Sequence, residues 1–412
     1  MTGGIMERDR DRLHEEFDRL RDNSARRTKN RGFELAARWN RDETEIEFLY
    51  RQGQLICDER DLDDVLAAFD KLRLDRPEVS EGPVGLVVIH LPGTDAYEVA
   101  AKLAGELGDE RIVAPNHVLD AQGHMAMCPA TEPIPLYGPI PELGEPVGQG
   151  EARVAVVDTG FLPEVAKDSG FERFAAVKKY EVDDDVFVPG TDQIRPYGGH
   201  GTAATARLLA VSGAQSVSVE VRDCLIGGAV DELAIVEDLE KVVHAGVEVI
   251  SVQAGLYARP GNTPKAFDMF YRRVLSRHPK TVIVAAAGNH GTDVPFWPAA
   301  YSWTTAVGSL TRNGDSRTSW SNFGYWVDTY TSGESTVVPF PNGSYTYVDK
   351  TSTRFTNGHA IWSGTSFATP VVAGLIARRM VERGVDAPVA RHIVLQEAAI
   401  GALPQTGPRL II

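Results

Sequence analysis

The chain contains little cysteine, because only Cys57, Cys128 and Cys224 occur in 412 residues. An odd number of cysteines without CxxC spacing supports neither a disulfide framework nor a zinc site. We therefore expect three free thiols, as in proteins of a reducing compartment.

Long hydrophobic runs are also missing. No window approaches the roughly 18 apolar residues that a membrane-spanning helix needs. The amino-terminal stretch MTGGIMERDRDRLHEEFDRL is charged where a secretory signal requires an apolar segment. We expect a cytoplasmic protein with no membrane partner.

Positive charge is in deficit. The 42 Lys and Arg residues are outnumbered by 57 Asp and Glu residues, which gives a formal net charge of -15. This charge opposes nucleic-acid phosphates, so we expect no nucleic-acid partner. Hydrophobic residues make up 43% and charged residues 24% of the chain, as is typical of a folded globular protein.

The first 150 residues are predicted to hold four segments. Residues 1–31 form a charged, solvated helical arm with a thin apolar stripe. Residues 32–83 contain a β-hairpin at a Gln-Gly turn and then a helix. Residues 84–124 have the order strand, helix, strand of a small α+β unit, and residues 125–150 are a linker rich in Pro and Gly.

The pattern changes in residues 151–412, which we expect to form one α/β domain. Helical patterns, for example at 231–245 and 264–277, separate short apolar runs that show no alternation. The runs lie at 152–158, 216–221, 247–255, 281–289 and 304–310. Strands buried on both faces have this character, which predicts a doubly wound, mostly parallel sheet with helices on both faces. Its ligand site should lie at the carboxyl ends of the strands.

Four polar residues occupy such positions: Asp158, His200, Asn289 and Ser366. Each has an ordinary structural explanation, namely a strand-end carboxylate, a packed histidine, a turn asparagine and a helix N-cap serine. Together they supply what a nucleophilic serine needs, which is a base, a group that orients the base and donors for an oxyanion.

The motifs around these residues are VVDTG at Asp158, HGT at His200, AAAGN at Asn289 and GTSFATP at Ser366. On these motifs the chain resembles the subtilisin family (subtilases) of serine proteases over residues 128–400. The resemblance implies a subtilisin-like fold in which Ser366 attacks a peptide carbonyl and His200 takes its proton. It implies further that Asp158 orients His200 and that Asn289 and the Ser366 N–H bind the oxyanion.

The resemblance also assigns substrate-binding positions. Gln253, Ala254 and Gly255 correspond to the strand that pairs with the substrate backbone, which in the family commonly ends Ser-Leu-Gly. Ala286, Ala287 and Gly288 would form one wall of the primary specificity pocket and Gly255 the other. Such small walls leave room for a medium or large side chain. For Gln253 the alternative is an outward polar residue without a substrate role.

Calcium stabilises many relatives, and EVDDDVFVPG at 181–190 is the acidic segment to consider. Three consecutive carboxylates point in different directions and lack the spacing of a calcium loop. We therefore interpret this segment as a solvated loop. No cofactor is expected to be required, although the resemblance leaves room for a structural calcium ion.

The unit at 84–124 resembles the family's ferredoxin-like inhibitory propeptide in its element order and in the motif APNHV. This resemblance implies that the chain's own amino-terminal domain is an intramolecular inhibitor and folding chaperone, with self-cleavage around residues 122–130. The leading hypothesis is a serine endopeptidase that acts on a protein or peptide precursor. The alternative is a catalytically silent pseudo-protease that serves as a peptide-binding or regulatory module.

Overall fold

The computed structural model describes residues 3–25, 33–120, 132–136, 139–141, 143, 150–213, 217–225, 227–259, 261–404 and 406–412. Cys128, most of the expected linker and the expected cleavage region therefore lie outside the described residues, whereas Cys57 and Cys224 are buried free thiols. We call residues 33–120 the amino-terminal module and residues 150–412 the carboxy-terminal domain.

The carboxy-terminal domain is built on a seven-stranded sheet in the order β15-β14-β13-β12-β7-β10-β8, in which all neighbours are parallel. The strands are β7 (Ala152–Asp158), β8 (Val177–Tyr180), β10 (Val217–Asp223), β12 (Val249–Val252), β13 (Val282–Ala286), β14 (Thr304–Leu310) and β15 (Thr329–Ser332). The five apolar runs in the sequence all become strands of this sheet, so the expected parallel architecture is confirmed.

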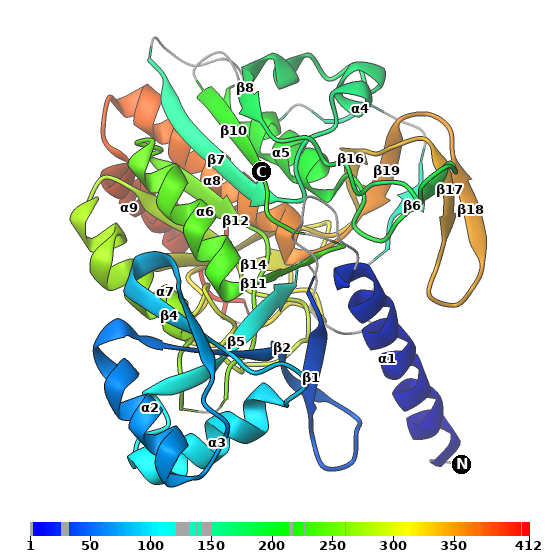
Figure 1. Ribbon diagram of the computed structural model, residues 1–412. Coiled ribbons are helices and arrows are strands. Elements are labelled where there is room, and N and C mark those ends of the chain that lie inside the picture. The colour runs from blue at the N-terminus through cyan, green and yellow to red at the C-terminus, as the bar shows by residue number, and fades with distance from the viewer. Residues whose placement is uncertain are drawn as a thin grey trace.

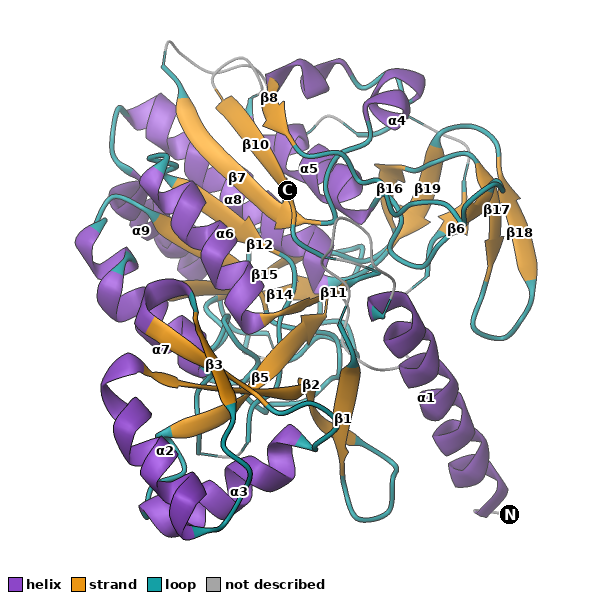
Figure 2. Cartoon of the chain, viewed as in Figure 1, coloured by secondary structure: helices purple, strands orange, loops and turns teal. Residues whose placement is uncertain are grey.

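Helices cover both faces of the sheet, as Figure 2 shows. One face packs on α6 (Glu232–His244) and α7 (Lys265–Arg273), and the other packs on α5 (His200–Ser212), α8 (Thr365–Arg383) and α9 (Ala387–Ile400). Alternate residues of β7 serve the two faces, with Val157 in the first core and Val156 in the second. Burial on both faces explains why the strands are apolar throughout.

Smaller elements complete the domain. They are α4 (Pro163–Asp168), β9 (Gln193–Ile194), β16 (Thr336–Pro339), β17 (Gly343–Thr346), β18 (Ser352–Phe355) and β19 (His359–Trp362). The short strand β6 (Ile134–Pro135), from the segment that precedes the domain, joins them. Strands β16, β19 and β6 form one three-stranded sheet, and β18, β17 and β9 form another.

The amino-terminal module is an antiparallel sheet backed by two helices (Figure 1). Its elements are β1 (Leu35–Trp39), β2 (Ile46–Asp58), α2 (Leu62–Lys71), β3 (Glu78–Glu81), β4 (Leu86–His90), α3 (Ala96–Leu107) and β5 (Val113–Asp120). The strand order β11-β5-β2-β4-β3 includes β11 (Ala229–Asp231), which the carboxy-terminal domain contributes. The two parts of the chain therefore share one sheet.

Two expectations for this region are wrong. The expected hairpin at Gln52-Gly53 is one continuous strand, β2, because its first half pairs with β1 and its second half with β4. The expected division between residues 32–83 and 84–124 also fails, because β2 lies between β4 and β5 in the sheet. These segments form a single folding unit.

The sheet of the module packs on α6 and α7. Ile56 and Leu119 lie in the same apolar core as those helices, whereas Leu55 and Cys57 face α2 and α3. At the edge of this interface the buried Glu232 accepts hydrogen bonds from the backbone N–H of His117 at 3.1 Å and pairs with His117 Nδ1 at 2.9 Å. The interface combines an apolar face with paired polar groups at its margin.

The charged arm forms α1 (Gly3–Ser24), which Figure 1 shows beside β1. Leu13 and Leu20 of its apolar stripe are buried against the module and Ala229. Glu15 Oε1 lies 2.9 Å from Lys350 Nζ in the turn between β17 and β18. The arm is thus a helix, as expected, and its stripe bridges the module and the carboxy-terminal domain.

Candidate active site

Asp158 and His200 form a buried pair at the carboxyl edge of the parallel sheet. Asp158 is the last residue of β7 and His200 is the first residue of α5. His200 Nδ1 lies 2.8 Å from Asp158 Oδ1 and 2.9 Å from Oδ2. Because a carboxylate only accepts, Nδ1 carries the proton and Nε2 keeps the lone pair that can take another.

Ser366 lies in the first turn of α8, which begins at Thr365 after Gly364. The helix therefore starts where Pro370 requires it, near Ser366. Ser366 Oγ donates to the carbonyl oxygen of Gln253 at 3.4 Å, and His200 Nε2 has no hydrogen-bond partner among the described residues. His200 packs on Phe367, the residue after Ser366, with ring centroids 5.2 Å apart, and its Nε2 is not bonded to Ser366 Oγ.

Asn289 follows β13 and is tied to the start of α8. Its Oδ1 accepts hydrogen bonds from the backbone N–H and the hydroxyl of Thr365, both at 2.9 Å. Since the oxygen end of the amide is held by Thr365, the NH2 end is directed away from that residue. The neighbouring Gly288 N–H donates to Thr365 Oγ1 at 3.2 Å, so three hydrogen bonds in all fix the loop to the helix.

Asp183 is a residue whose position the sequence did not indicate, because we expected a solvated loop there. It is buried, and its Oδ2 accepts from Thr159 Oγ1 at 3.0 Å and from the Gly199 N–H at 2.9 Å. Thr159 and Gly199 are the chain neighbours of Asp158 and His200. Asp183 therefore connects the two segments that carry the pair, and its burial raises its pKa well above the usual range.

The four residues are closed to solvent in this structure. Asp158 and His200 have no exposed surface, and Ser366 is 1% exposed. The ring of His200 packs on Trp362 and Phe367, with centroids 5.2 Å away in both cases, and these two rings also contact each other. The aromatic neighbours fix the plane of the imidazole in addition to its carboxylate partner.

The module reaches this edge through the end of β5. Asp120 and Gly255 exchange two backbone hydrogen bonds of 3.0 Å in an antiparallel bridge. On its other side, Asp120 is in register with Ala229 of β11. The end of β5 is therefore inserted between two segments of the carboxy-terminal domain.

The side chain of Gln253 does not point outward. Its side chain is buried, and the amide orientation that satisfies both ends accepts from Ser251 Oγ at 2.6 Å and donates to Val157 O at 3.2 Å. It joins the ends of β12 and β7. Only its backbone carbonyl faces Ser366.

The expected pocket for a medium or large side chain is filled. Ala254, Ala286 and Ala287 are buried in or beside the sheet. Phe296, which is 3% exposed, occupies the space between Gly255 and Gly288. The residues of the two walls have small side chains, as the sequence indicates, but the ring of Phe296 lies between the walls.

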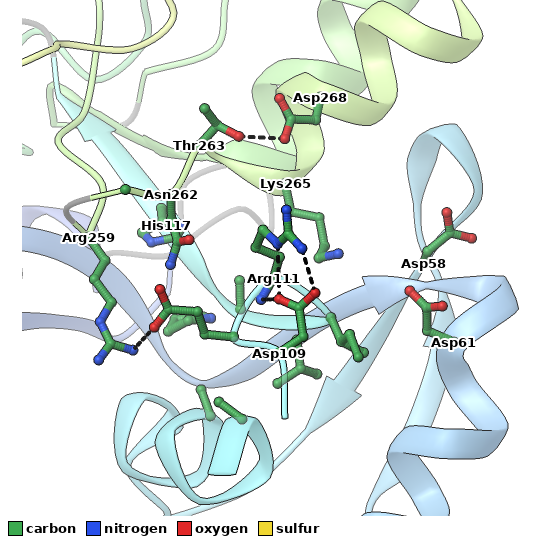
Figure 3. A pocket seen from close by; sticks show the side chains of 18 of the residues that line it. Asp58, Asp61, Asp109, Arg111, His117, Arg259, Asn262, Thr263, Lys265 and Asp268 are labelled. Atoms are coloured by element: carbon green, nitrogen blue, oxygen red, sulfur yellow. Dashed lines mark hydrogen bonds and ion pairs between the residues drawn. The ribbon is translucent and has the colours of Figure 1, made fainter. Parts of the chain in front are cut away.

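A separate cavity of about 330 Å³ lies between the module and α7 (Figure 3). None of the four candidate residues, Asp158, His200, Asn289 and Ser366, lines it. Asp109 and Arg111 point toward each other, and their hydrogen bonds hold the pKa of Asp109 at about 2. Lys265 also lines the cavity, and burial lowers its pKa. This cavity belongs to the interface between the two parts of the chain.

Within the described ranges no group of three or more His, Cys, Asp or Glu side chains could hold a metal ion. Asp183, Asp184 and Asp185 diverge, since Asp183 is buried, Asp184 is exposed and Asp185 pairs with Arg195. A search of the described helices finds none that is long and apolar enough to cross a membrane.

Comparisons with known proteins identify the family of this chain. The model described as the subtilase family matches residues 149–399. Thermitase from Thermoactinomyces vulgaris is 30% identical over 254 residues, which cover 58% of this chain and 80% of thermitase. A thermophilic serine proteinase from Bacillus sp. (strain AK1) is 28% identical over 238 residues, which cover 56% of this chain and 52% of that protein. The match thus spans about half the length of the second relative.

Among solved structures, fervidolysin from Fervidobacterium pennivorans, described as a keratinolytic enzyme related to subtilisin, has a similar fold. Its TM-score is 0.56 at 17% identity, and the match covers 88% of this chain and 60% of fervidolysin. The family model matches more than half of the chain and includes all four polar residues of the candidate site. The chain therefore belongs to the subtilase family.

Proposed function

We propose that the chain is a serine endopeptidase that hydrolyses peptide bonds through an acyl-enzyme. The observation that carries the proposal is the buried pair of His200 and Asp158, joined at 2.8 Å, at the sheet edge where Ser366 opens α8. A buried carboxylate is costly unless it is bonded, and here it is used to hold the imidazole in the tautomer of a general base.

In the proposed reaction His200 Nε2 takes the proton of Ser366 Oγ as the oxygen attacks the substrate carbonyl. Ser366 must first turn from the Gln253 carbonyl, a weak contact at 3.4 Å. The negative charge that develops on the carbonyl oxygen is stabilised by the Asn289 amide, the Ser366 N–H and the amino-terminal dipole of α8. His200 then protonates the leaving amine, and water releases the acyl group by the same steps.

We propose further that the amino-terminal module inhibits this site from within the chain. The Asp120–Gly255 pairing places β5 on the strand to which we assign the substrate backbone, in the manner of strand addition. The buried state of Ser366 supports this reading, because a substrate requires access to its Oγ. Self-cleavage around residues 122–130, as the sequence predicts, would release the segment from the site.

The second candidate is a pseudo-protease, and the closed site is the observation that favours it. A fluorophosphonate probe distinguishes the two, because labelling needs a nucleophilic serine and an open oxyanion site. We expect the wild-type chain to become labelled as a shorter species appears by intact mass, and the Ser366→Ala variant to remain full-length and unlabelled. A wild-type chain that keeps its mass and stays unlabelled after incubation supports the pseudo-protease.

A further inference from the structure

Phe296 fills the gap between Gly255 and Gly288 beside Ser366. We propose that this ring closes the primary side-chain pocket and restricts cleavage to bonds that follow a small residue such as Gly, Ala or Ser. The inference rests on the proposed peptidase function, and it names the class of substrate that the site accepts.

The gap adjoins the nucleophile on both sides. Gly255 lies two residues beyond Gln253, whose carbonyl oxygen accepts from Ser366 Oγ. Gly288 donates its N–H to Thr365, the residue before Ser366. A substrate whose carbonyl carbon sits at Ser366 Oγ therefore presents the side chain of that same residue to the space between the two glycines.

The ring of Phe296 occupies this space closely. A Cβ atom added to Gly255 would lie 2.6 Å from Cζ and 2.7 Å from Cδ1 of Phe296. A Cβ atom added to Gly288 would lie 2.9 Å from Cδ1 of the same ring. Only glycine therefore fits at positions 255 and 288, and the Phe296 ring packs directly on the backbone at both.

Backbone pairing holds Phe296 in place. Leu256 and Trp297, the residues that follow Gly255 and Phe296, exchange two hydrogen bonds of 2.8 Å. The Phe296 carbonyl accepts from the Ala300 N–H at 2.8 Å. The ring is thus positioned by the same segment that forms one wall of the gap, and it cannot leave without breaking this bridge or changing rotamer.

Aromatic packing blocks the path behind the ring. The Tyr257 ring lies 5.0 Å from Phe296 and the His290 ring 6.3 Å from it, measured between centroids. Asn322 Nδ2 donates to the Tyr257 hydroxyl at 3.0 Å and to the Ala287 carbonyl at 2.7 Å. These contacts pack Phe296 against Tyr257 and His290.

A small substrate side chain needs no room in the gap, whereas a large one must displace the ring and its packing. Differences of one methylene in an apolar pocket already change kcat/KM by about 10-fold or more. We expect the wild-type protein to prefer Ala over Phe before the cleaved bond by about 100-fold in kcat/KM.

The test uses two tetrapeptide p-nitroanilides that differ only in the residue before the cleaved bond, which is Ala in one and Phe in the other. The full chain is first incubated until its mass, measured by mass spectrometry, no longer changes. The Phe296→Gly variant should cleave the Phe peptide at least about 100-fold faster than the wild type does, which abolishes or reverses the preference. Tyr257→Phe removes one hydroxyl from the same cluster and should keep the preference for Ala.

Wild-type cleavage of both peptides within about threefold would overturn the proposal, because it would mean that Phe296 moves aside. If Phe296→Gly does not fold, Phe296→Leu replaces it, with its melting temperature measured in parallel. A folded Phe296→Leu with wild-type selectivity also overturns the proposal. A wild-type chain that cleaves neither peptide and binds no fluorophosphonate instead overturns the proposed peptidase function.

Discussion

The carboxyl edge of the seven-stranded sheet and the amino-terminal module, whose β5 ends at that edge, use buried polar groups in opposite ways. At the edge, each polar group orients another one, as Asp158 orients His200 and Thr365 orients Asn289. In the module, polar groups bind the module to the carboxy-terminal domain. His117 pairs with Glu232, and the Asp120 backbone pairs with Gly255.

From this difference we can predict which substitutions should lower the rate of the proposed reaction and which should change the access of substrate to Ser366. Removing a group at the edge should lower turnover while the fold remains, because the sheet and its helices are held by apolar cores on both faces. Removing an attachment of the module should instead open the site. Four substitutions test this contrast.

Replacing Ser366 by Ala should have the largest effect. Loss of the nucleophile of a serine protease lowers kcat by about 10⁶-fold, since only binding and oxyanion stabilisation remain. Peptide hydrolysis gives the rate, and circular dichroism gives the melting temperature, which should change little. Ser363→Ala is the matched control, because Ser363 Oγ accepts a hydrogen bond from the Ser335 N–H outside the reaction. Equal losses in both variants would contradict the assignment.

Replacing Asn289 by Ala should lower kcat by about 100- to 1000-fold and leave KM nearly unchanged, because an oxyanion donor acts mainly in the transition state. Steady-state kinetics on one peptide separate the two parameters. Thr365→Val is the control, since it keeps the Asn289 amide and removes one of its two bonds to Thr365. A rise in KM without a fall in kcat would place Asn289 in substrate binding instead.

Sequence patterns predicted the edge far better than the module. The run at 152–158 became β7 with the same bounds, because a strand buried on both faces must be apolar throughout. The Gln52-Gly53 turn failed, because the partners of the two halves of β2 are distant in sequence. Asp183 and Phe296 were missed for the same reason, since only tertiary contacts bury Asp183 beside the segment that carries His200 and set Phe296 between two glycines.

Replacing Asp120 by Pro should open the site. Proline has no N–H to donate to the Gly255 carbonyl, so one of the two hydrogen bonds of the bridge is lost. We expect freshly folded full-length protein to react with a fluorophosphonate about 10-fold faster than the wild type, with the rate measured before any shorter species appears. Asp120→Ala keeps the N–H and should react at the wild-type rate. A slower reaction of Asp120→Pro would mean that this pairing builds the site instead of blocking it.

Replacing Asp183 by Asn should have the smallest effect, and it should appear as a change in pH dependence. Because burial raises the pKa of Asp183 in the folded state, the folded chain binds its proton more tightly than the unfolded chain does. The resulting stabilisation is present below the unfolded pKa of about 4 and is lost as the pH rises through the folded pKa. Asparagine can accept the same hydrogen bonds from Thr159 and Gly199 without a charge. In urea unfolding, the free energy of unfolding should therefore fall less between pH 4 and pH 8 for Asp183→Asn than for the chain with Asp183. The measurement is made in the Ser366→Ala background to prevent self-cleavage. An unchanged pH slope would show that Asp183 titrates normally and that its charge is tolerated beside Asp158 and His200.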